Sequence, residues 1–257
     1  MTLFFVTNSN KTNMKKLICF LSLSLVLASC SSDDSTETID NSGSTLFVQK
    51  TVEGTGASAT NTFYSYNGNK IVSAINEDGD GYYYTYTGDL ITKAELKRDD
   101  VAVETEYYEY DANQRLISFR SISVSAMDAG FKTLYTYNAD GTVGLKAYSG
   151  SRTSQTNLDS TSIAYFENGE VVKITSPDYP TLNYTYDGKN NPFKNVLGFD
   201  KISYDESQAV GMAQNVVTSN DWEEPNDVTD TTTYTYNDSN YPLTQTIRGY
   251  KTTYSYE

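Results

Sequence analysis

One pattern recurs from Phe63 to the end of the chain: two aromatic residues spaced by two, then a turn, then a pair of aliphatic residues. Residues two apart in a strand point to the same face, so each Tyr-x-Tyr places both rings on one face and Thr, Ser or Glu on the other. The Asn-Gly and Asp-Gly dipeptides that follow suit tight reversals. Copies of the pattern begin at or near Tyr64, Tyr84, Tyr108, Tyr135, Ile163, Tyr184, Tyr234 and Tyr254.

This repeat predicts an all-β fold: an antiparallel meander of hairpins that forms a curved sheet or an open barrel, with a tyrosine ladder on one face. The ladder positions 66, 86, 110, 137, 165 and 186 leave room for two strands and two connections between successive members. With only 38% hydrophobic residues but 23 Tyr, tyrosine must supply much of the core. Each buried hydroxyl then needs a polar partner.

The interval from Tyr186 to Tyr236 is about twice as long as the other intervals between ladder tyrosines and interrupts the repeat. It contains the segment Asn190–Asn195 and a stretch, Ala209–Asn215, that could form one helical turn. A connection this long inside a meander is usually a lid, a plug or a binding loop. We expect one long insertion loop here, packed over an open end of the sheet.

The amino-terminal region predicts export and lipid attachment. A basic start at Met14–Lys16 precedes an apolar region of eleven residues, Leu17–Leu27, which is the length of the apolar core of a signal peptide and too short to span a bilayer as a helix. The run ends in Leu-Ala-Ser-Cys30, which resembles the lipobox of type II signal peptides. We therefore predict a signal peptide at residues 1–29, with 1–13 belonging to a misplaced start, and lipidation of Cys30.

Residues 30–45 would comprise the lipidated cysteine and a flexible acidic tether, and residues 46–257 the Tyr-rich β-repeat domain. The tether is rich in Ser, Thr, Asp and Glu, as solvated coils are. Its opening, Ser31-Ser32-Asp33-Asp34, resembles the surface-export signal of Bacteroidota lipoproteins. Acyl chains on Cys30 would make anchoring effectively permanent. The membrane is thus an expected partner, and the expected location is the outer membrane, with exposure at the cell surface as one option.

Charge and residue inventory exclude several function classes. The chain has a formal net charge of −14, which repels nucleic acid. It has no histidine, and its two cysteines are Cys19 in the export signal and Cys30. Zinc sites built on His or Cys, and catalytic Ser-His-Asp or Cys-His sets, are therefore excluded. We expect no cofactor, with calcium as the one candidate ion.

The calcium candidate is the segment Asn76-Glu-Asp78-Gly-Asp80-Gly, which matches the opening of an EF-hand loop. The twelfth position is Thr87, where such a loop requires Glu, and strands are expected on both sides. These departures favour a hairpin turn over a metal site at Asn76, Asp78 and Asp80.

A second candidate site surrounds the single tryptophan. Trp222 lies beside Glu223 and Glu224, and Asp227 follows shortly after. An exposed indole could stack on a sugar ring while the carboxylates accept hydrogen bonds from its hydroxyls. The sequence favours the alternative, in which Trp222 pins the long loop to the sheet and the acidic residues are solvated around it.

The motif Tyr-x-Tyr-(Asp/Asn)-x-x-Gly-x-Leu resembles the YD repeat of RHS-type proteins, and loosely covers most of residues 60–257. The lipobox, acidic tether, YD-like hairpins and Asn-Pro-Phe-Lys at 191–194 together resemble uncharacterised Bacteroidota lipoproteins with porin-like or open-barrel β-meanders. That resemblance implies a fold and a location, and no reaction.

The sequence favours a non-enzymatic, membrane-anchored domain that binds a glycan or a surface protein. Two alternatives stay open. One is a carboxylate-dependent glycoside hydrolase, since paired acids brought together by loops cannot be recognised from spacing along the chain. The other is a structural subunit of an outer-membrane complex.

Overall fold

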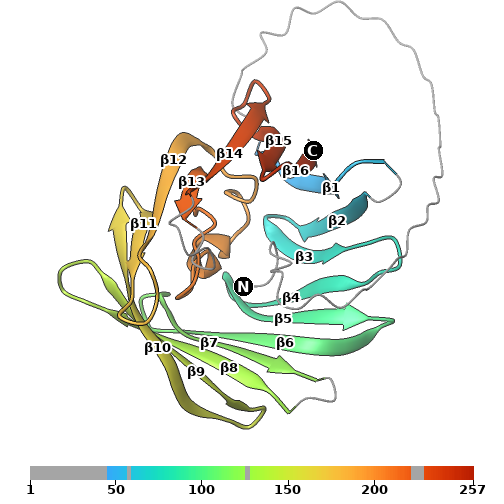
Figure 1. Ribbon diagram of the computed structural model, residues 1–257. Helices are drawn as coiled ribbons and strands as arrows, with labels where there is room; N and C mark the ends of the chain where they lie inside the picture. The colour runs from blue at the N-terminus through green and yellow to red at the C-terminus, as the bar shows by residue number, and fades with distance from the viewer. Residues whose placement is uncertain (1–44, 57–58, 125–127, 221–228) are drawn as a thin grey trace, which may run out of the picture.

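The computed structural model describes residues 45–56, 59–124, 128–220 and 229–257. Within these residues sixteen antiparallel strands follow one another in chain order, and β1 pairs with β16 to close a barrel (Figure 1). The predicted all-β meander is confirmed, and its closure goes beyond the curved sheet or open barrel that we expected. The strands are β1 Val48–Glu53, β2 Thr60–Asn67, β3 Lys70–Ile75, β4 Gly81–Thr87, β5 Leu90–Arg98, β6 Val101–Tyr110, β7 Leu116–Ser123, β8 Gly130–Tyr137, β9 Val143–Ser151, β10 Ser154–Glu167, β11 Glu170–Thr175, β12 Leu182–Asn190, β13 Gln214–Asn220, β14 Thr229–Tyr236, β15 Pro242–Ile247 and β16 Tyr250–Tyr256.

The Tyr-x-Tyr pairs occupy the even-numbered strands, with both rings facing the inside of the barrel. The second tyrosine of several pairs donates its hydroxyl to a backbone carbonyl of the preceding strand, which satisfies the polar group inside an apolar wall. The donor and acceptor residues are Tyr66 and Val48 (2.8 Å), Tyr110 and Ile91 (2.7 Å), Tyr186 and Val171 (2.6 Å), and Tyr256 and Pro242 (2.8 Å).

Strand β10 departs from the ladder. Its inward positions are held by Ala164, which is fully buried, and by Phe166, whose ring contacts Tyr204 edge-on at 5.3 Å between centroids. Tyr165, which we expected in the ladder, therefore points outward and lies under the ammonium of Lys173, opposite it in register, at 4.1 Å. The aromatic pair is shifted by one residue in this repeat, and a one-residue shift changes the face.

Tight turns of the expected kind join the strands. Asn168 and Gly169 form the two-residue loop between β10 and β11, and both have positive φ values, 52° and 85°. Two consecutive positive φ angles define the type I′ turn, whose twist matches that of the flanking strands.

The outer face of the barrel carries cations paired with aromatic rings across neighbouring strands. Arg120 lies 4.8 Å from the ring of Tyr107, directly opposite it, and Lys50 lies 5.2 Å from the ring of Phe63. Threonine pairs such as Thr185 and Thr218, whose hydroxyls are 2.6 Å apart, occupy other outward positions. Polar and charged side chains are therefore present on the outer face of several strands around the barrel.

Because the strands alternate in direction, the barrel has two distinct ends. One end holds the connections that follow the even-numbered strands, including the long one between β12 and β13, and the first described residues lie there beside the carboxyl terminus. Phe47 and Glu257 exchange backbone hydrogen bonds of 2.9 and 3.1 Å at this end. Residues 191–213, which contain the 3₁₀ helix η2 (Phe199–Ile202), are called the plug below, and their end of the barrel the plugged end. The opposite end is the open end.

In the part of the chain that the structure describes, no helix is both long enough and apolar enough to cross a membrane.

Candidate functional site

The plug lies inside the ring of strands, where it appears in orange in Figure 1. Phe193, Phe199 and Ile202 are buried, and the ring of Phe193 packs against that of Tyr64 on β2 at 5.4 Å between centroids. Our expectation of a long insertion loop is confirmed. The loop fills the end of the barrel from within, so it does more than cover an open edge.

One buried carboxylate ties the carboxyl end of the plug to the wall. Glu170, at the start of β11, is 2% exposed and accepts hydrogen bonds from three consecutive backbone N–H groups. They belong to Met212 (2.7 Å), Ala213 (2.7 Å) and Gln214 (2.8 Å). Hydrogen bonds to a charged acceptor are stronger than neutral ones, so this contact fixes the carboxyl end of the plug.

The middle of the plug reaches deeper into the barrel than its ends. A β-bridge joins Tyr204 to Ala209, and Asp205 caps the turn between them by accepting from the backbone N–H and hydroxyl of Ser207. The hydroxyl of Thr133 on β8 donates to Glu206 at 2.8 Å. Since Thr133 lies further from the plugged end than the tyrosine rings of its strand, Glu206 is carried to the middle of the lumen.

A pocket of about 500 Å³ lies between this turn and the open end. Strands β6 to β12 form its walls, and Glu206 and Ser207 of the plug form its floor. The lining combines apolar surfaces with carboxylates, and it includes Phe119, Phe131, Tyr179, Glu104, Asp159 and Glu206. This volume and this mixture of apolar walls with a few polar groups are typical of small-molecule sites.

Burial changes the chemistry of the floor. Loss of solvation raises the pKa of Glu206 to about 7, and the neighbouring negative charge of Asp205 adds to the rise. The hydrogen bond from Thr133 favours the charged form and opposes the shift. Glu206 therefore titrates near neutrality, so both its protonated and its ionised forms are available to a ligand.

The serine hydroxyl groups near the pocket carboxylates donate their hydrogen bonds to acceptors of the protein itself. Ser121 donates to Glu104 at 2.6 Å, Ser149 donates to Asp159 at 2.8 Å, and Ser176 donates to the carbonyl of Thr161 at 2.8 Å. A carboxylate offers about four lone-pair sites, so accepting capacity is left after these bonds. The polar part of the pocket consequently presents acceptors to a ligand.

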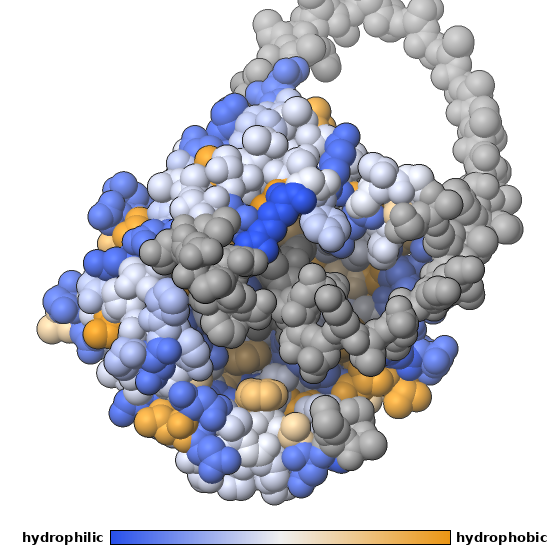
Figure 2. Space-filling model, in the orientation of Figure 1, coloured by the Kyte–Doolittle hydropathy of each residue, from blue (hydrophilic) through white to orange (hydrophobic). Residues whose placement is uncertain are grey.

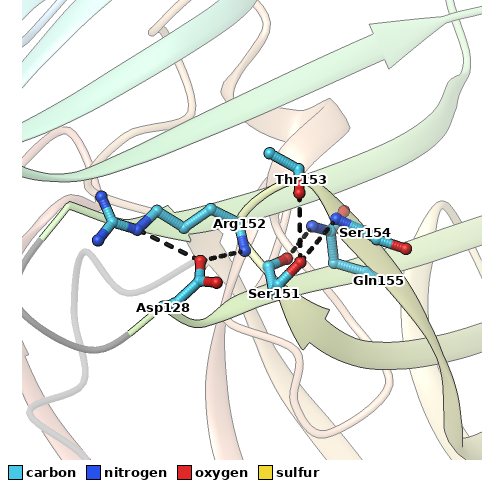
Figure 3. A network of polar contacts seen from close by, with 6 residues as sticks. All are labelled: Asp128, Ser151, Arg152, Thr153, Ser154 and Gln155. Carbon is cyan, nitrogen blue, oxygen red and sulfur yellow. Dashed lines mark hydrogen bonds and ion pairs between the residues drawn. The ribbon is translucent and has the colours of Figure 1, made fainter.

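The rim at the open end is fastened by a polar network, shown in Figure 3. Asp128, just before β8, accepts a hydrogen bond from the backbone N–H of Arg152 at 3.0 Å and pairs with its guanidinium at 3.5 Å. Ser151 accepts from the backbone N–H of Ser154 within the same hairpin. These contacts join the β7–β8 connection to the β9–β10 hairpin. In Figure 2 apolar residues, in orange, lie in and beside the hollow of this face.

The structure places Asn76, Asp78 and Asp80 in the turn between β3 and β4. The side-chain oxygen of Asn76 accepts from the backbone N–H groups of Asp78 (3.0 Å) and Asp80 (2.9 Å), and Asp80 accepts from the backbone N–H of Asp99 (2.8 Å). Among the described residues no group of three or more His, Cys, Asp or Glu side chains is arranged to hold a metal ion. The side chains serve the turn, and calcium binding there stays a prediction.

Two other predicted sites lie outside the described residues. They are the lipidation site Cys30 and the group of Trp222, Glu223, Glu224 and Asp227. The latter segment joins β13 to β14, whose described ends, Asn220 and Thr229, lie at the open end of the barrel.

Sequence reasoning missed the pocket residues Glu104 and Glu206. A signal was available for the first, because Glu104, Glu106, Tyr108 and Tyr110 share one face of β6 at a spacing of two. Acidic residues on the ladder face of a strand indicate an inward carboxylate. Glu206 carries no such signal, since it lies in the irregular plug.

Comparison with known proteins finds matches among solved structures. No model of a known protein family matches the chain, and no curated protein matches it. Fourteen chains of solved structures do match. One is a porin-like protein from Bacteroides uniformis, with 12% identity and a TM-score of 0.37, covering 80% of this chain and 84% of that one. We therefore interpret the pocket from its own residues.

Proposed function

We propose that this protein is a lipid-anchored outer-membrane lipoprotein whose barrel stands in water and binds a glycan unit in its pocket, without catalysis. The observation that carries the binding role is the pocket of about 500 Å³ above the plug, lined by aromatic rings and hydrogen-bonding groups. The lipobox and Cys30 support the anchor.

The polar outer face supports a barrel outside the lipid. A barrel that spans a membrane presents an apolar band to the acyl chains, and an outward Lys or Arg near the midplane costs about 2–4 kcal/mol. Here Arg120 and Lys173 lie over outward rings, and Lys93 forms an ion pair of 3.0 Å with Glu95. Acyl chains on Cys30, followed by a tether, would then hold the barrel at the membrane surface.

The anchor is tested by the change Cys30→Ser in the full chain. We expect the wild-type protein to enter the detergent phase when a detergent extract is separated into two phases, and the variant to stay in the aqueous phase and remain soluble without detergent. Mass spectrometry of the wild-type protein should show acyl chains on residue 30. A variant that still requires detergent would contradict the proposal, because the barrel itself would then be embedded.

A sugar ring fits the pocket because it has an apolar face of C–H groups and a rim of hydroxyls. The rings of Phe119, Phe131 and Tyr179 offer apolar surfaces, and Phe131 and Tyr179 are 57% and 41% exposed. Large apolar groups left accessible inside a concave site favour a bound ligand, since covering them is energetically favourable.

The glycan is tested by screening oligosaccharides with isothermal titration calorimetry. We expect Phe131→Ala to weaken binding about tenfold, since removal of a central aromatic contact usually costs more than 1 kcal/mol. The matched control is Tyr107→Ala, which removes an outward ring and should leave affinity unchanged. Equal affinities of wild type and Phe131→Ala would place the glycan elsewhere. Trp222→Ala would then test the segment Asp221–Asp227 as the contact.

The alternative of a glycoside hydrolase is favoured by one observation: Glu104 and Glu206 both line the pocket, and the pKa of Glu206 is raised to about 7 by burial. Glycosidases combine one protonated and one ionised carboxyl group. The oligosaccharides used for the binding screen distinguish the two functions. Release of new reducing ends that disappears in Glu206→Gln would identify an enzyme.

A further inference from the structure

We infer that the pocket selects a ligand that carries a protonated amine, so that the glycan unit is an amino sugar with a free amino group. This inference rests on the proposed function and names the ligand class for the same site.

The first step is the balance of donors and acceptors. The hydroxyl protons of Ser121 and Thr133 are donated to Glu104 and Glu206. What Glu104 and the two hydroxyl oxygens leave for a ligand is accepting capacity, and Glu206 adds to it in its ionised form. The ligand must supply the protons, and a protonated amine supplies three without offering an acceptor.

The second step is charge. The carboxylates of Glu104 and Asp159 line the pocket, Glu206 adds a third negative charge where it is ionised, and the whole chain carries a net charge of −14. Lys132 and Tyr148 also border the pocket, but Lys132 alternates with the inward Phe131 and Thr133 on β8, so its side chain leaves the strand on the outer face, where its ammonium lies 4.9 Å from the ring of Tyr148. The field in the lumen therefore attracts cations and repels acidic sugars.

The third step is the aromatic wall. A cation near the face of an aromatic ring is attracted by the ring quadrupole, and more strongly where water is excluded. Phe119, Phe131 and Tyr179 line the same pocket as the carboxylates. An aromatic wall with carboxylates at its edge matches an organic ammonium. A metal ion requires several ligand atoms that converge on one position. Among the described residues, no group of three or more His, Cys, Asp or Glu side chains is arranged in this way.

The test compares two trisaccharides that differ only in their amino groups. Glucosamine trimer, with free amines, and its N-acetylated counterpart are titrated into the full mature protein at pH 6, where the amines are protonated. We expect the free-amine form to bind at least about tenfold more tightly, as charge-assisted hydrogen bonds predict. A trimer of uronic acid units should show no measurable binding.

Glu104→Gln isolates the charge while keeping an acceptor for Ser121. We expect this change to reduce the preference for the free amine to below about threefold and to leave binding of the acetylated trimer unchanged. Glu95→Gln, on the outer face, is the matched control and should keep the full preference. Equal affinity of the two trimers for wild type, or a full preference in Glu104→Gln, overturns the inference while the glycan function stands. If neither trimer, nor any other oligosaccharide in the screen, binds, the proposed function itself fails.

Discussion

Replacing Glu170 by glutamine should lower the free energy of unfolding by about 3 kcal/mol. The carboxylate is buried and accepts from the backbone N–H groups of Met212, Ala213 and Gln214. Glutamine has one accepting oxygen, and its NH₂ group would face backbone donors. At least one buried N–H would lose its partner, and the remaining bonds would lose the assistance of the charge.

Urea denaturation followed by circular dichroism measures this loss. Glu167→Gln is the matched control, because Glu167 is opposite Glu170 in the same hairpin but exposed, and it should change stability by less than about 0.5 kcal/mol. Limited proteolysis gives a second readout: the variant should be cleaved faster within residues 191–213. A loss below about 1 kcal/mol, with unchanged cleavage, would show that the plug is held by its other contacts and does not depend on Glu170.

The fold was predictable because its main determinant is local. In each regular repeat the spacing of two between Tyr64 and Tyr66, or between Tyr184 and Tyr186, fixes which side chains share a face, and the turn dipeptides fix the reversals. Closure was not predictable, since pairing of β1 with β16 joins the two ends of the domain, and no local pattern specifies it. Tyr165 was placed on the wrong face because Ala164 takes the inward position, and a small residue there leaves no aromatic signal.

The plug shows why the candidate site was harder to predict than the fold. Asn190–Asn195 was recognised as part of a long insertion, but Ala209–Asn215 forms a bridge at Ala209 and the start of β13 in place of the helical turn that we considered. Tertiary contacts decide this conformation: Glu170 lies about 40 residues earlier in the chain, and the lumen contact of Thr133 with Glu206 joins residues 73 apart. The pocket floor therefore depends on long-range contacts, which cannot be predicted from the periodic pattern of the sequence.

Glu206 should make the stability of the protein fall as pH rises from about 4.5 to about 7. Its folded-state pKa is raised to about 7 by burial and by Asp205, above the ordinary value of 4.5. Between these two values the folded state binds more protons than the unfolded state, so stability declines with rising pH. Each pKa unit corresponds to about 1.4 kcal/mol, which gives a loss on the order of 2–3 kcal/mol across this range.

Glu206→Gln removes the titration but retains an oxygen that accepts the hydrogen bond from Thr133. The variant should match wild type at pH 4, where the wild-type carboxyl is mostly protonated in both states, and exceed it by about 3 kcal/mol at pH 8. Other carboxyl groups titrate in both proteins, so the quantity to compare is the difference between their unfolding free energies at each pH. A difference that is the same at pH 4 and pH 8 would show that Glu206 remains ionised in the fold. It would also remove the protonated carboxyl on which the hydrolase alternative depends.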